Sequence, residues 1–318
     1  MKAIVYRSYG GPEKLELTDI AQPSPGPGQL LIKVHSSSVN PIDWKLQSGA
    51  YRWVRPVRFP ATPGFDVAGE VAAVGAGVDD FAVGLRVHAR IAEGEGRGLA
   101  EYAVAGTDVS APIPTGMDFG QAAGLPLAGM TALQGLRNEC RMPLDGAKGR
   151  LLIVGASGGV GHLALQIGKA AGAHTVGVCS TRNVDFVRGL GADAVIQYDR
   201  PNPYSDIEPF DIIYNCVSGD PGPWLPLLKK GGSYASCMPS AMTFVRSMAN
   251  PLSSKRVRAV MLKPSGADLR ILNRLFEAGK LRVAIDSRFP LAETRKAWER
   301  SQAGRAVGKI LVDVVSAS

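Results

Sequence analysis

The sequence predicts an α/β protein, with a β-rich, barrel-like N-terminal region followed by a doubly wound parallel sheet. Residues 1 to about 118 contain short apolar strands, such as 30–39 and 67–75, separated by turns rich in Gly and Pro. From about residue 150, apolar strands alternate with helices, which is typical of a parallel sheet. The first of these strands runs directly into a glycine-dense turn and a helix. These observations indicate two domains.

The glycine-dense turn predicts a dinucleotide-binding site. Residues 151–154 form the strand, and Leu163, Leu165 and Ile167 lie on the following helix. A pyrophosphate fits this context because the helix start offers free N–H groups and a positive dipole end. Ala156 replaces the first glycine of the usual spacing, which is tolerable where φ stays negative. An ordinary strand-to-helix turn is the alternative. The expected cofactor contacts are Ala156, Ser157, Gly158, Gly159, Val160 and Gly161.

The change of pattern along the chain predicts the domain boundaries. We expect residues 1–120 to form the first domain, completed by residues 266–318, which return to it. Residues 121–265 then form the nucleotide-binding domain. A helical stretch broken by Pro126 leads into its first strand.

The composition narrows the class of partner. The chain has 318 residues, 45% of them hydrophobic and 20% charged, as in ordinary globular proteins. The net charge of +8 comes from scattered Lys and Arg without a basic arm, so a nucleic acid partner is not expected. No apolar run reaches 18 residues, and no membrane span is expected. The start MKAIVYRSYGG lacks the layout of a signal peptide, which makes the cytoplasm the default location.

The end of the second strand of the parallel sheet predicts which dinucleotide is bound. In a dinucleotide fold this position meets the adenine ribose, where an acid favours NAD and a base accepts the 2′-phosphate of NADP. Here the strand ends in Ser180, Thr181 and Arg182, with no acid before Asp185. Tyr198, at the end of the third strand, adds a hydroxyl. A solvated loop is the alternative. We expect NADP(H).

Several motifs together resemble one known family. The β-rich N-terminus precedes segments 64–87, 155–173, 190–193 and 308–312, which occur in the order found in the medium-chain dehydrogenase/reductase superfamily. More narrowly, they resemble its zinc-independent quinone oxidoreductase branch, which includes zeta-crystallin. The resemblance covers essentially the whole chain. It implies a GroES-like β-barrel catalytic domain, a Rossmann domain, NADPH as hydride donor and a homodimer.

The same resemblance bears on metal binding. Zinc-dependent alcohol dehydrogenases of this superfamily carry Cys at the position matching Asn40 and a His-Glu pair matching Phe65 and Asp66. Asn40 and Phe65 supply neither thiolate nor imidazole, whereas tetrahedral zinc needs three or four such ligands. We therefore expect no metal. Asp66 is expected to be structural, bonded to loop backbone.

The segment 38–45 matches the active-site loop of the family. It implies that Lys45 stabilises charge or donates a proton, and that Asn40 donates a hydrogen bond to the substrate oxygen or the nicotinamide ribose. Asp43 is expected to orient Lys45 or the loop. The alternative for all three is a polar loop held together internally, since Asn-Pro and Asp favour turns.

Further positions follow from the expected fold. Thr131 matches a family threonine beside the nicotinamide, with bonding to its own helix backbone as the alternative. Asn215 and Val217 end the fourth strand, near the adenosine and ribose. Lys309 is interpreted as a solvated lysine before a strand rather than a ligand of the 2′-phosphate. Tyr51 and Trp53 are candidates for an apolar substrate mouth.

These observations lead to one main functional hypothesis. An NADPH-dependent oxidoreductase without zinc, which transfers hydride to a quinone or an α,β-unsaturated carbonyl, accounts for the glycine turn, the missing zinc ligands and the 40–45 segment. An enoyl-thioester reductase is one alternative. A non-catalytic NADPH-binding protein, structural or RNA-binding as crystallin relatives can be, is another.

Overall fold

The chain folds into two compact units. The computed structural model describes residues 1–91, 98–205 and 207–314. Unit 1 comprises Met1–Ala128, Pro264–Glu277 and Val283–Ser318, and unit 2 comprises Gly129–Lys263 and Ala278–Arg282. The sequence-based domain boundaries lie near residues 120 and 265, and the two compact units meet in the chain after residues 128 and 263. The return of Ala278–Arg282 to unit 2 has no counterpart in the sequence-based division.

Unit 1 is built on β-structure: β6 alternates buried and half-buried positions, whereas β3 and β5 contain runs of buried residues. Its main sheet has the order β14-β15-β3-β4-β5-β7, with β6 also paired to β3, and only the β14–β15 pair is parallel among the described strands. The strands are β3 (Gln29–Val39), β4 (Asp66–Val74), β5 (Arg86–Arg90), β6 (Tyr102–Gly106), β7 (Ser110–Pro112), β14 (Ile285–Pro290) and β15 (Lys309–Asp313). A separate antiparallel pair joins β1 (Lys2–Val5) to β2 (Glu16–Asp19).

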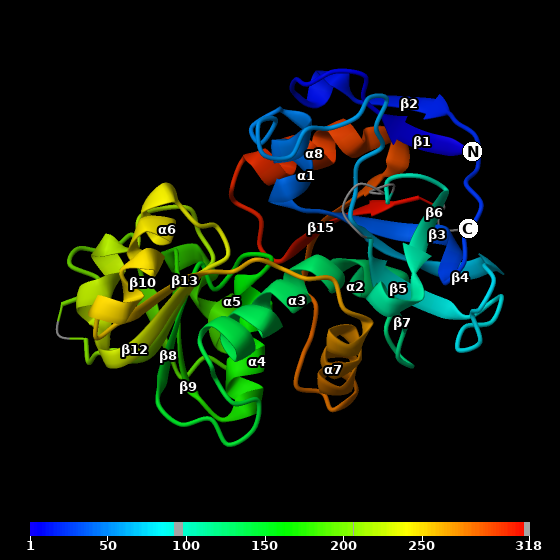
Figure 1. Ribbon diagram of the computed structural model, residues 1–318. Coiled ribbons are helices and arrows are strands. Elements are labelled where there is room, and N and C mark those ends of the chain that lie inside the picture. The colour runs from blue at the N-terminus through cyan, green and yellow to red at the C-terminus, as the bar shows by residue number, and fades with distance from the viewer. Residues whose placement is uncertain (92–97, 206, 315–318) are drawn as a thin grey trace. The chain divides into compact units, whose positions relative to one another are not determined.

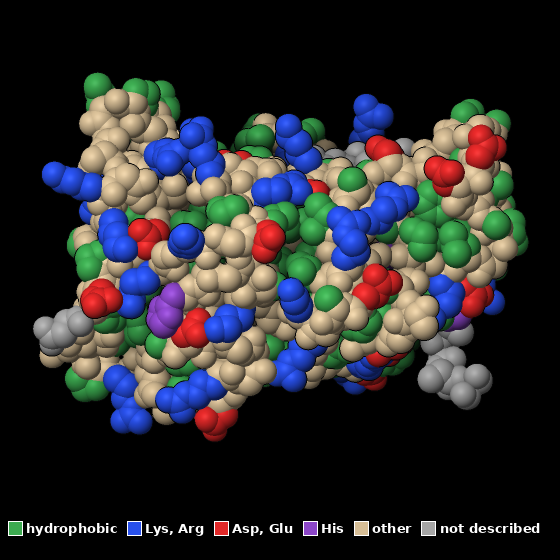
Figure 2. Space-filling view, turned by 90° about the horizontal axis from the view of Figure 1, so that it is seen from below, with side chains coloured by type: hydrophobic (Ala, Val, Ile, Leu, Met, Phe, Trp, Pro, Cys, Tyr) green, Lys and Arg blue, Asp and Glu red, His purple; other side chains and the backbone are tan. Residues whose placement is uncertain are grey.

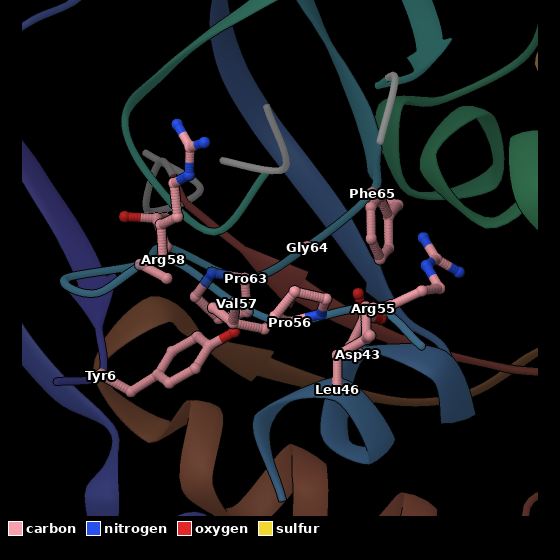
Figure 3. Close-up of a pocket in the computed structure, with 12 residues that line it drawn as sticks. Tyr6, Asp43, Leu46, Arg55, Pro56, Val57, Arg58, Pro63, Gly64 and Phe65 are labelled. Carbon is pink, nitrogen blue, oxygen red and sulfur yellow. The ribbon is translucent and has the colours of Figure 1, made fainter. Parts of the chain in front are cut away.

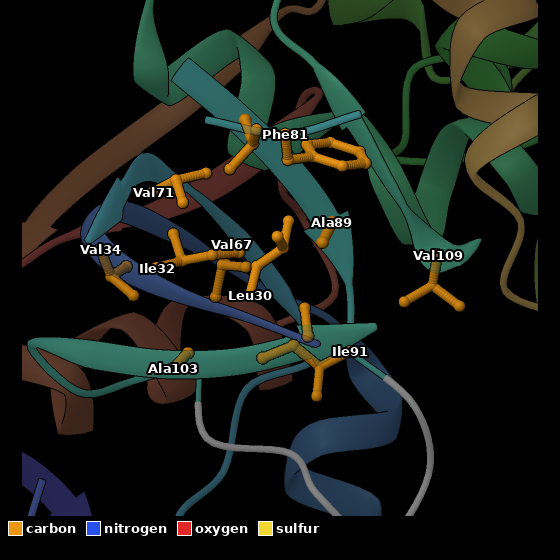
Figure 4. Packing of buried hydrophobic residues seen from close by; sticks show 12 residues of the cluster. Leu30, Ile32, Val34, Val67, Val71, Phe81, Ala89, Ile91, Ala103 and Val109 are labelled. Carbon is orange, nitrogen blue, oxygen red and sulfur yellow. The ribbon is translucent and has the colours of Figure 1, made fainter. Parts of the chain in front are cut away.

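The inward faces of these strands form an apolar core. Leu30, Ile32, Val67 and Ala89 are fully buried and converge with neighbouring side chains from β3, β4 and β5 (Figure 4). Helices and short 3-10 turns complete unit 1: η1 (Pro12–Lys14), α1 (Pro41–Gln47), η2 (Thr107–Val109), α2 (Phe119–Gly124), α7 (Gly266–Glu277), η7 (Leu291–Glu293) and α8 (Thr294–Gln302). The fully buried Trp298 packs α8 in a cluster with Ile310 of β15.

Unit 2 contains one parallel sheet. Its six strands have the order β10-β9-β8-β11-β12-β13, which is the 3-2-1-4-5-6 order of a doubly wound dinucleotide-binding fold. The strands are β8 (Arg150–Val154), β9 (His174–Cys179), β10 (Ala194–Gln197), β11 (Phe210–Asn215), β12 (Leu228–Ser236) and β13 (Arg256–Ala259). The strand order reverses direction between β8 and β11, and ligands of such sheets bind at that point.

Helices alternate with the strands of unit 2 (Figure 1). They are α3 (Pro126–Gln134, which begins in unit 1), the π-helical turn η3 (Gly135–Glu139), α4 (Gly161–Ala171), η4 (Thr181–Asn183), α5 (Val184–Gly189), η5 (Gly222–Leu227), α6 (Ala241–Met248) and η6 (Asn250–Leu252). The predicted break at Pro126 separates α2 from α3. The α/β class expected from the sequence, with a β-rich unit and a doubly wound parallel sheet, is confirmed.

Candidate active site

The glycine turn lies directly after β8, at the reversal point of the sheet. Gly155 takes the left-handed conformation with φ +77°, so the glycine that the turn requires precedes Ala156. Ala156 is buried, and its N–H donates to the carbonyl of Val178 on β9 at 2.9 Å. The substitution of the first motif glycine by Ala156 is therefore compatible with the turn.

Two glycines of the turn have different physical roles. A Cβ on Gly161, at the start of α4, would overlap the carbonyl of Gly155, so this glycine lets the helix approach the turn. A Cβ on Gly158 would meet only the Gly155 oxygen, at 3.4 Å, so Gly158 borders open space. The N–H of His162, in the first turn of α4, donates to the Gly158 carbonyl at 3.0 Å, and the positive dipole end of α4 lies at the same turn. This cradle, which a side chain would fill, fits a pyrophosphate.

The end of β9 combines the predicted base with an acid that was not predicted. Ser180 is largely buried and Arg182 is exposed. Thr181, however, donates through its hydroxyl and its N–H to Asp199, at 2.8 and 3.0 Å. These hydrogen bonds hold the pKa of Asp199 below its usual range. The Thr181 hydroxyl is thus already paired. Asp199 was missed because it follows the neighbouring strand β10.

The other expected cofactor positions lie on unit 2 in different environments. Tyr198 follows β10 and is 57% exposed. Asn215 ends β11 fully buried; its side chain donates to the Tyr234 hydroxyl and accepts from the N–H of Val217, which is itself exposed. Thr131 is buried on α3, where its carbonyl accepts a hydrogen bond from another buried side chain.

Unit 1 holds a buried polar cluster around Asn40. The Asn40 side chain accepts from Lys309 Nζ at 2.6 Å and donates to Asp66 Oδ2 at 2.8 Å. Asp66 also accepts from the Ser38 hydroxyl at 2.7 Å and, through Oδ1, from the N–H of Leu127 at 2.9 Å. The Lys309 ammonium lies 3.8 Å from Asp66 Oδ2. Asn40 therefore bridges a buried ion pair.

Two sequence-based interpretations need correction here. Lys309 is 3% exposed rather than solvated, because β15 pairs with β3 and places it beside Asn40. Burial lowers the pKa of its ammonium, while Asp66 and Asp43 act in the opposite sense. The Asn40 amide donates both to Asp66 and to the Ser38 carbonyl, so the expected donation to a substrate or a ribose is not what this arrangement provides. Asp66 has the structural role that was expected, with an N–H of α3 as its backbone partner.

The 40–45 segment is the start of helix α1 rather than a loop. Asn40 is its N-cap residue, Pro41 occupies the first helical position, and Asp43 Oδ2 accepts from the Asn40 N–H at 2.7 Å. Asn-Pro-x-Asp is a helix-start signal that could have predicted this helix. Asp43 thus stabilises the start of α1 by accepting the hydrogen bond from the N-cap residue.

A cavity of about 470 Å³ opens beside this helix in unit 1 (Figure 3). Its walls combine apolar residues such as Leu46, Val57 and Phe65 with the polar and charged residues Tyr6, Asp43, Arg55, Arg58 and Thr62. Asp43 Oδ1 has no hydrogen-bond partner among the described residues. Burial is the main cause that raises the pKa of Asp43 to about 7, and Asp66 adds to it; the Asn40 N–H, Lys309 and Arg90 oppose this shift.

The other expected catalytic and substrate positions do not form the wall of this cavity. Lys45 is half-buried on α1, with Nζ 5.5 Å from the centre of the Trp44 ring. Trp53 is 86% exposed and Tyr51 is also exposed. The segment that does line the cavity begins two residues after Trp53 and runs from Arg55 to Arg58. No periodic pattern in the sequence distinguishes the exposed residues 51 and 53 from the cavity-lining residues 55–58.

The donor set at the positions that match zinc ligands does not fit a zinc ion. The Asn40 oxygen is bonded to an ammonium, both Asp66 oxygens accept hydrogen bonds, and Phe65 offers no donor atom. Within residues 1–91, 98–205 and 207–314, no group of three or more His, Cys, Asp or Glu side chains is arranged to hold a metal.

Comparison with known proteins places the chain in a family. A model of the alcohol dehydrogenase GroES-like domain matches residues 26–126, and a zinc-binding dehydrogenase model matches residues 190–312. The chain is 38% identical to the chloroplast envelope quinone oxidoreductase homolog of Arabidopsis thaliana, over 98% of both chains. This chain belongs to the medium-chain dehydrogenase/reductase superfamily. It is an oxidoreductase, as the sequence predicted.

Two further similarities come from the same superfamily. The chain is 33% identical to the chloroplastic NADPH-dependent alkenal/one oxidoreductase of Arabidopsis thaliana, over 98% of this chain and 79% of the relative. The solved quinone oxidoreductase of Coxiella burnetii superposes with a TM-score of 0.89 at 32% identity and covers 99% of both chains. The GroES-like and Rossmann domains implied by the resemblance are confirmed.

The cytoplasmic location expected for this oxidoreductase is wrong by the same comparisons. Its relatives from Arabidopsis thaliana, Spinacia oleracea and Triphysaria versicolor are chloroplast proteins, and its human relative is mitochondrial. Composition and the character of the first strand follow the fold and do not encode a compartment. None of the described helices has the length and apolar character needed to cross a bilayer.

Proposed function

We propose that this chain reduces quinones or α,β-unsaturated carbonyl compounds with a hydride from NADPH and without zinc. The observation that carries the proposal is the Lys309–Asn40–Asp66 cluster, which fills the ligand positions of zinc-dependent members with an internally satisfied ion pair. An alcohol then has no Lewis acid to activate it, and hydride addition to an electron-poor acceptor is the favoured direction. The names of the quinone and alkenal/one oxidoreductase relatives point to the same acceptors.

Unit 2 supplies the residues that would hold the cofactor. The pyrophosphate would lie on Gly158 and the start of α4, within the turn from Ala156 to Gly161. Ser180 and Arg182 would bind the 2′-phosphate, with Tyr198 beside them, which favours NADPH over NADH. Thr131, Asn215 and Val217 are proposed as further contacts. When bound, the cofactor supplies a hydride from its nicotinamide.

The cavity of unit 1 suits a flat, apolar acceptor. Pro56, Pro63 and Phe65 form apolar parts of its wall, against which a conjugated carbonyl compound can pack, and Arg55 and Arg58 add positive charge. Lys45 stays a candidate for charge stabilisation from the neighbouring face of α1.

A turnover screen tests this function. Purified protein with NADPH is expected to reduce simple quinones and enones. Turnover is measured as the loss of absorbance of the reduced nicotinamide. The rate of the Lys45→Ala variant shows whether that lysine contributes to turnover. Faster turnover of enoyl thioesters would favour the thioester reductase instead. NADPH binding without turnover of any acceptor would favour a non-catalytic protein.

The surface charge bears on the alternative of an RNA-binding protein. Figure 2 shows basic and acidic side chains interspersed on one face, without a continuous basic surface.

We also infer that the enzyme is a homodimer, as the resemblance implies. Helix α6 carries the exposed apolar side chains Met242, Phe244, Val245 and Met248, and it packs beside β13, an edge strand of its sheet. Apolar patches of this kind mark association surfaces. Sedimentation velocity is expected to give twice the chain mass, and Val245→Glu is expected to reduce it to the monomer.

A further inference from the structure

Polar and charged residues line part of the cavity of unit 1: Tyr6, Asp43, Thr62, Arg55 and Arg58. Tyr6, which follows β1, and Asp43, on α1, approach it from opposite sides of the view in Figure 3. Both residues are nearly buried, at 4% and 3% exposure. Burial raises the pKa of the Tyr6 phenol, and the charge of Asp43 adds to this shift.

The Asp43 carboxyl has one oxygen in use and one without a partner. Oδ2 accepts the N–H of Asn40, whereas Oδ1 has no hydrogen-bond partner among the described residues. A buried carboxylate oxygen without a donor is costly, and the group avoids the cost by holding a proton. Protonated on Oδ1, Asp43 becomes a hydrogen-bond donor in the cavity wall.

Tyr6 is a second donor of the same kind. Its backbone is fixed by two hydrogen bonds with Ala61, so the ring is held in place. Burial raises the pKa of its phenol, which stays protonated. A phenol and a neutral carboxylic acid that line one cavity are a combination able to stabilise an oxyanion.

We propose that the Tyr6 hydroxyl and the protonated Asp43 carboxyl bind the carbonyl oxygen of the acceptor and stabilise the oxyanion formed on it. This inference rests on the proposed function and assigns the oxyanion site to residues other than Lys45. For an enone, hydride forms a C–H bond at the β-carbon, the C=C π pair moves toward the carbonyl, and an enolate results. Tyr6 and Asp43 donate to the enolate oxygen, and water then protonates the α-carbon.

Several charged groups face Asp43 and set its protonation. Asp66 on β4 favours the neutral acid, whereas Lys309 on β15 and Arg90 on β5 favour the carboxylate. Arg55 and Arg58 lie in the same cavity wall. Because the neutral form is the donor, the oxyanion site is complete below about pH 7 and is lost as Asp43 ionises above it.

Binding of an oxyanion analogue tests the site without turnover. An acidic phenol that is ionised throughout the range, such as 2,6-difluoro-4-nitrophenol, is titrated into the chain at pH 6 and followed by absorbance. Tyr6→Phe and Asp43→Asn are each expected to weaken binding about 10-fold. The matched variants Tyr102→Phe and Asp79→Asn, which lie outside the cavity wall, are expected to bind like the wild type.

The pH dependence of enone reduction with NADPH provides the second readout. The wild-type kcat is expected to fall as pH rises through about 7, and Tyr6→Phe is expected to lower kcat about 100-fold. Asp43→Asn keeps the helix cap and a non-titrating N–H donor, so its kcat is lower but loses this pH dependence.

The outcomes separate the inference from the proposed function. Phenolate affinity and kcat that stay at wild-type values in both Tyr6→Phe and Asp43→Asn overturn the inference, most directly if Lys45→Ala abolishes turnover instead. A wild type that binds the phenolate in a Tyr6- and Asp43-dependent manner, yet reduces no quinone or enone, supports the oxyanion site and overturns the proposed function.

Discussion

The glycine turn of unit 2 and the polar cluster of unit 1 are assembled in opposite ways. The turn is one continuous segment, 155–161, in which Gly155 takes a left-handed φ and Gly161 lets α4 approach the Gly155 carbonyl. The cluster joins Asn40, Asp66 and Lys309, with Lys309 and Asn40 separated by 269 positions in the sequence. A cofactor cradle can therefore be predicted from a short motif, whereas a site made by sheet register cannot.

Substitutions in the glycine turn are expected to have the largest effects on NADPH affinity. Two of them distinguish a loss of binding from a loss of stability. Gly158→Ala places a methyl group in the cradle without a close contact, so the NADPH Kd is expected to rise at least ~100-fold, or about 2.7 kcal/mol, with an unchanged Tm. Gly161→Ala would force α4 away from the Gly155 carbonyl, and both Tm and binding are expected to fall. Fluorescence titration and thermal unfolding check the pair. Equal Tm losses in the two variants would contradict the distinction.

Lys309 illustrates what a sequence without pairing information leaves out. A lysine before a strand is solvated in most proteins, because its burial needs a compensating charge. Here the antiparallel register sets Ile310 opposite Val39, which brings Lys309 to Asn40 and Asp66. Nothing in the segments around 40 and 309 specifies that register by itself. The succession of strands and helices along the chain and the α/β class, which follow from local periodicity, could be predicted.

Helix α1 and the contact of Asp199 were not predicted from the sequence, for two different reasons. The start of α1 carried a readable signal in Asn40, Pro41 and Asp43, and the family resemblance to an active-site loop obscured it. Asp199 reaches Thr181 from the neighbouring strand, so the end of β9 alone could not reveal an acid there. The helix could have been predicted from its own residues, whereas the Asp199 contact depends on tertiary structure.

The buried cluster is expected to stabilise unit 1 strongly. Lys309→Met leaves Asp66 buried without its cation, and the free energy of unfolding is expected to fall by about 3–5 kcal/mol in urea denaturation. The double variant Lys309→Met, Asp66→Asn is expected to recover part of the loss. Lys296→Met removes the exposed ion pair with Glu293 and is expected to cost less than about 1 kcal/mol. A similar cost for both lysines would argue against the buried pair.

Asp43 gives the cluster a pH dependence that the turn lacks. Its pKa is about 7 in the folded chain against 3.8 for the unfolded group, so the folded state binds the extra proton between these values. The Asp43 contribution to stability is therefore fully present below about pH 4 and is lost as pH rises through 7. Asp43→Asn removes this loss and is expected to be more stable than the wild type at pH 8, by roughly 2–4 kcal/mol. Chemical denaturation at pH 5 and pH 8 compares the two, and a difference independent of pH would refute the assignment.

The smallest expected effect lies at the end of β9, where the structure adds an acid to the predicted base. Arg182 is exposed, and its attraction to a 2′-phosphate is screened, so Arg182→Ala is expected to raise the NADPH Kd about 10-fold, or 1.4 kcal/mol, and to leave the NADH Kd unchanged. Asp199→Asn removes a negative charge beside the same site and is expected to shift the NADPH:NADH ratio in the opposite direction.

Arg188→Ala is the matched control for this pair, because Arg188 is an exposed arginine on α5 away from the end of β9. Titrations at low and high salt separate a phosphate contact from a general field, since only a direct contact keeps its preference for NADPH when screening increases. If Arg182→Ala weakens NADPH and NADH equally, the guanidinium supports the fold of the turn rather than the 2′-phosphate. Cofactor choice then depends on Ser180 and on Asp199, whose hydrogen bonds with Thr181 are as hidden from the sequence as the Lys309 cluster.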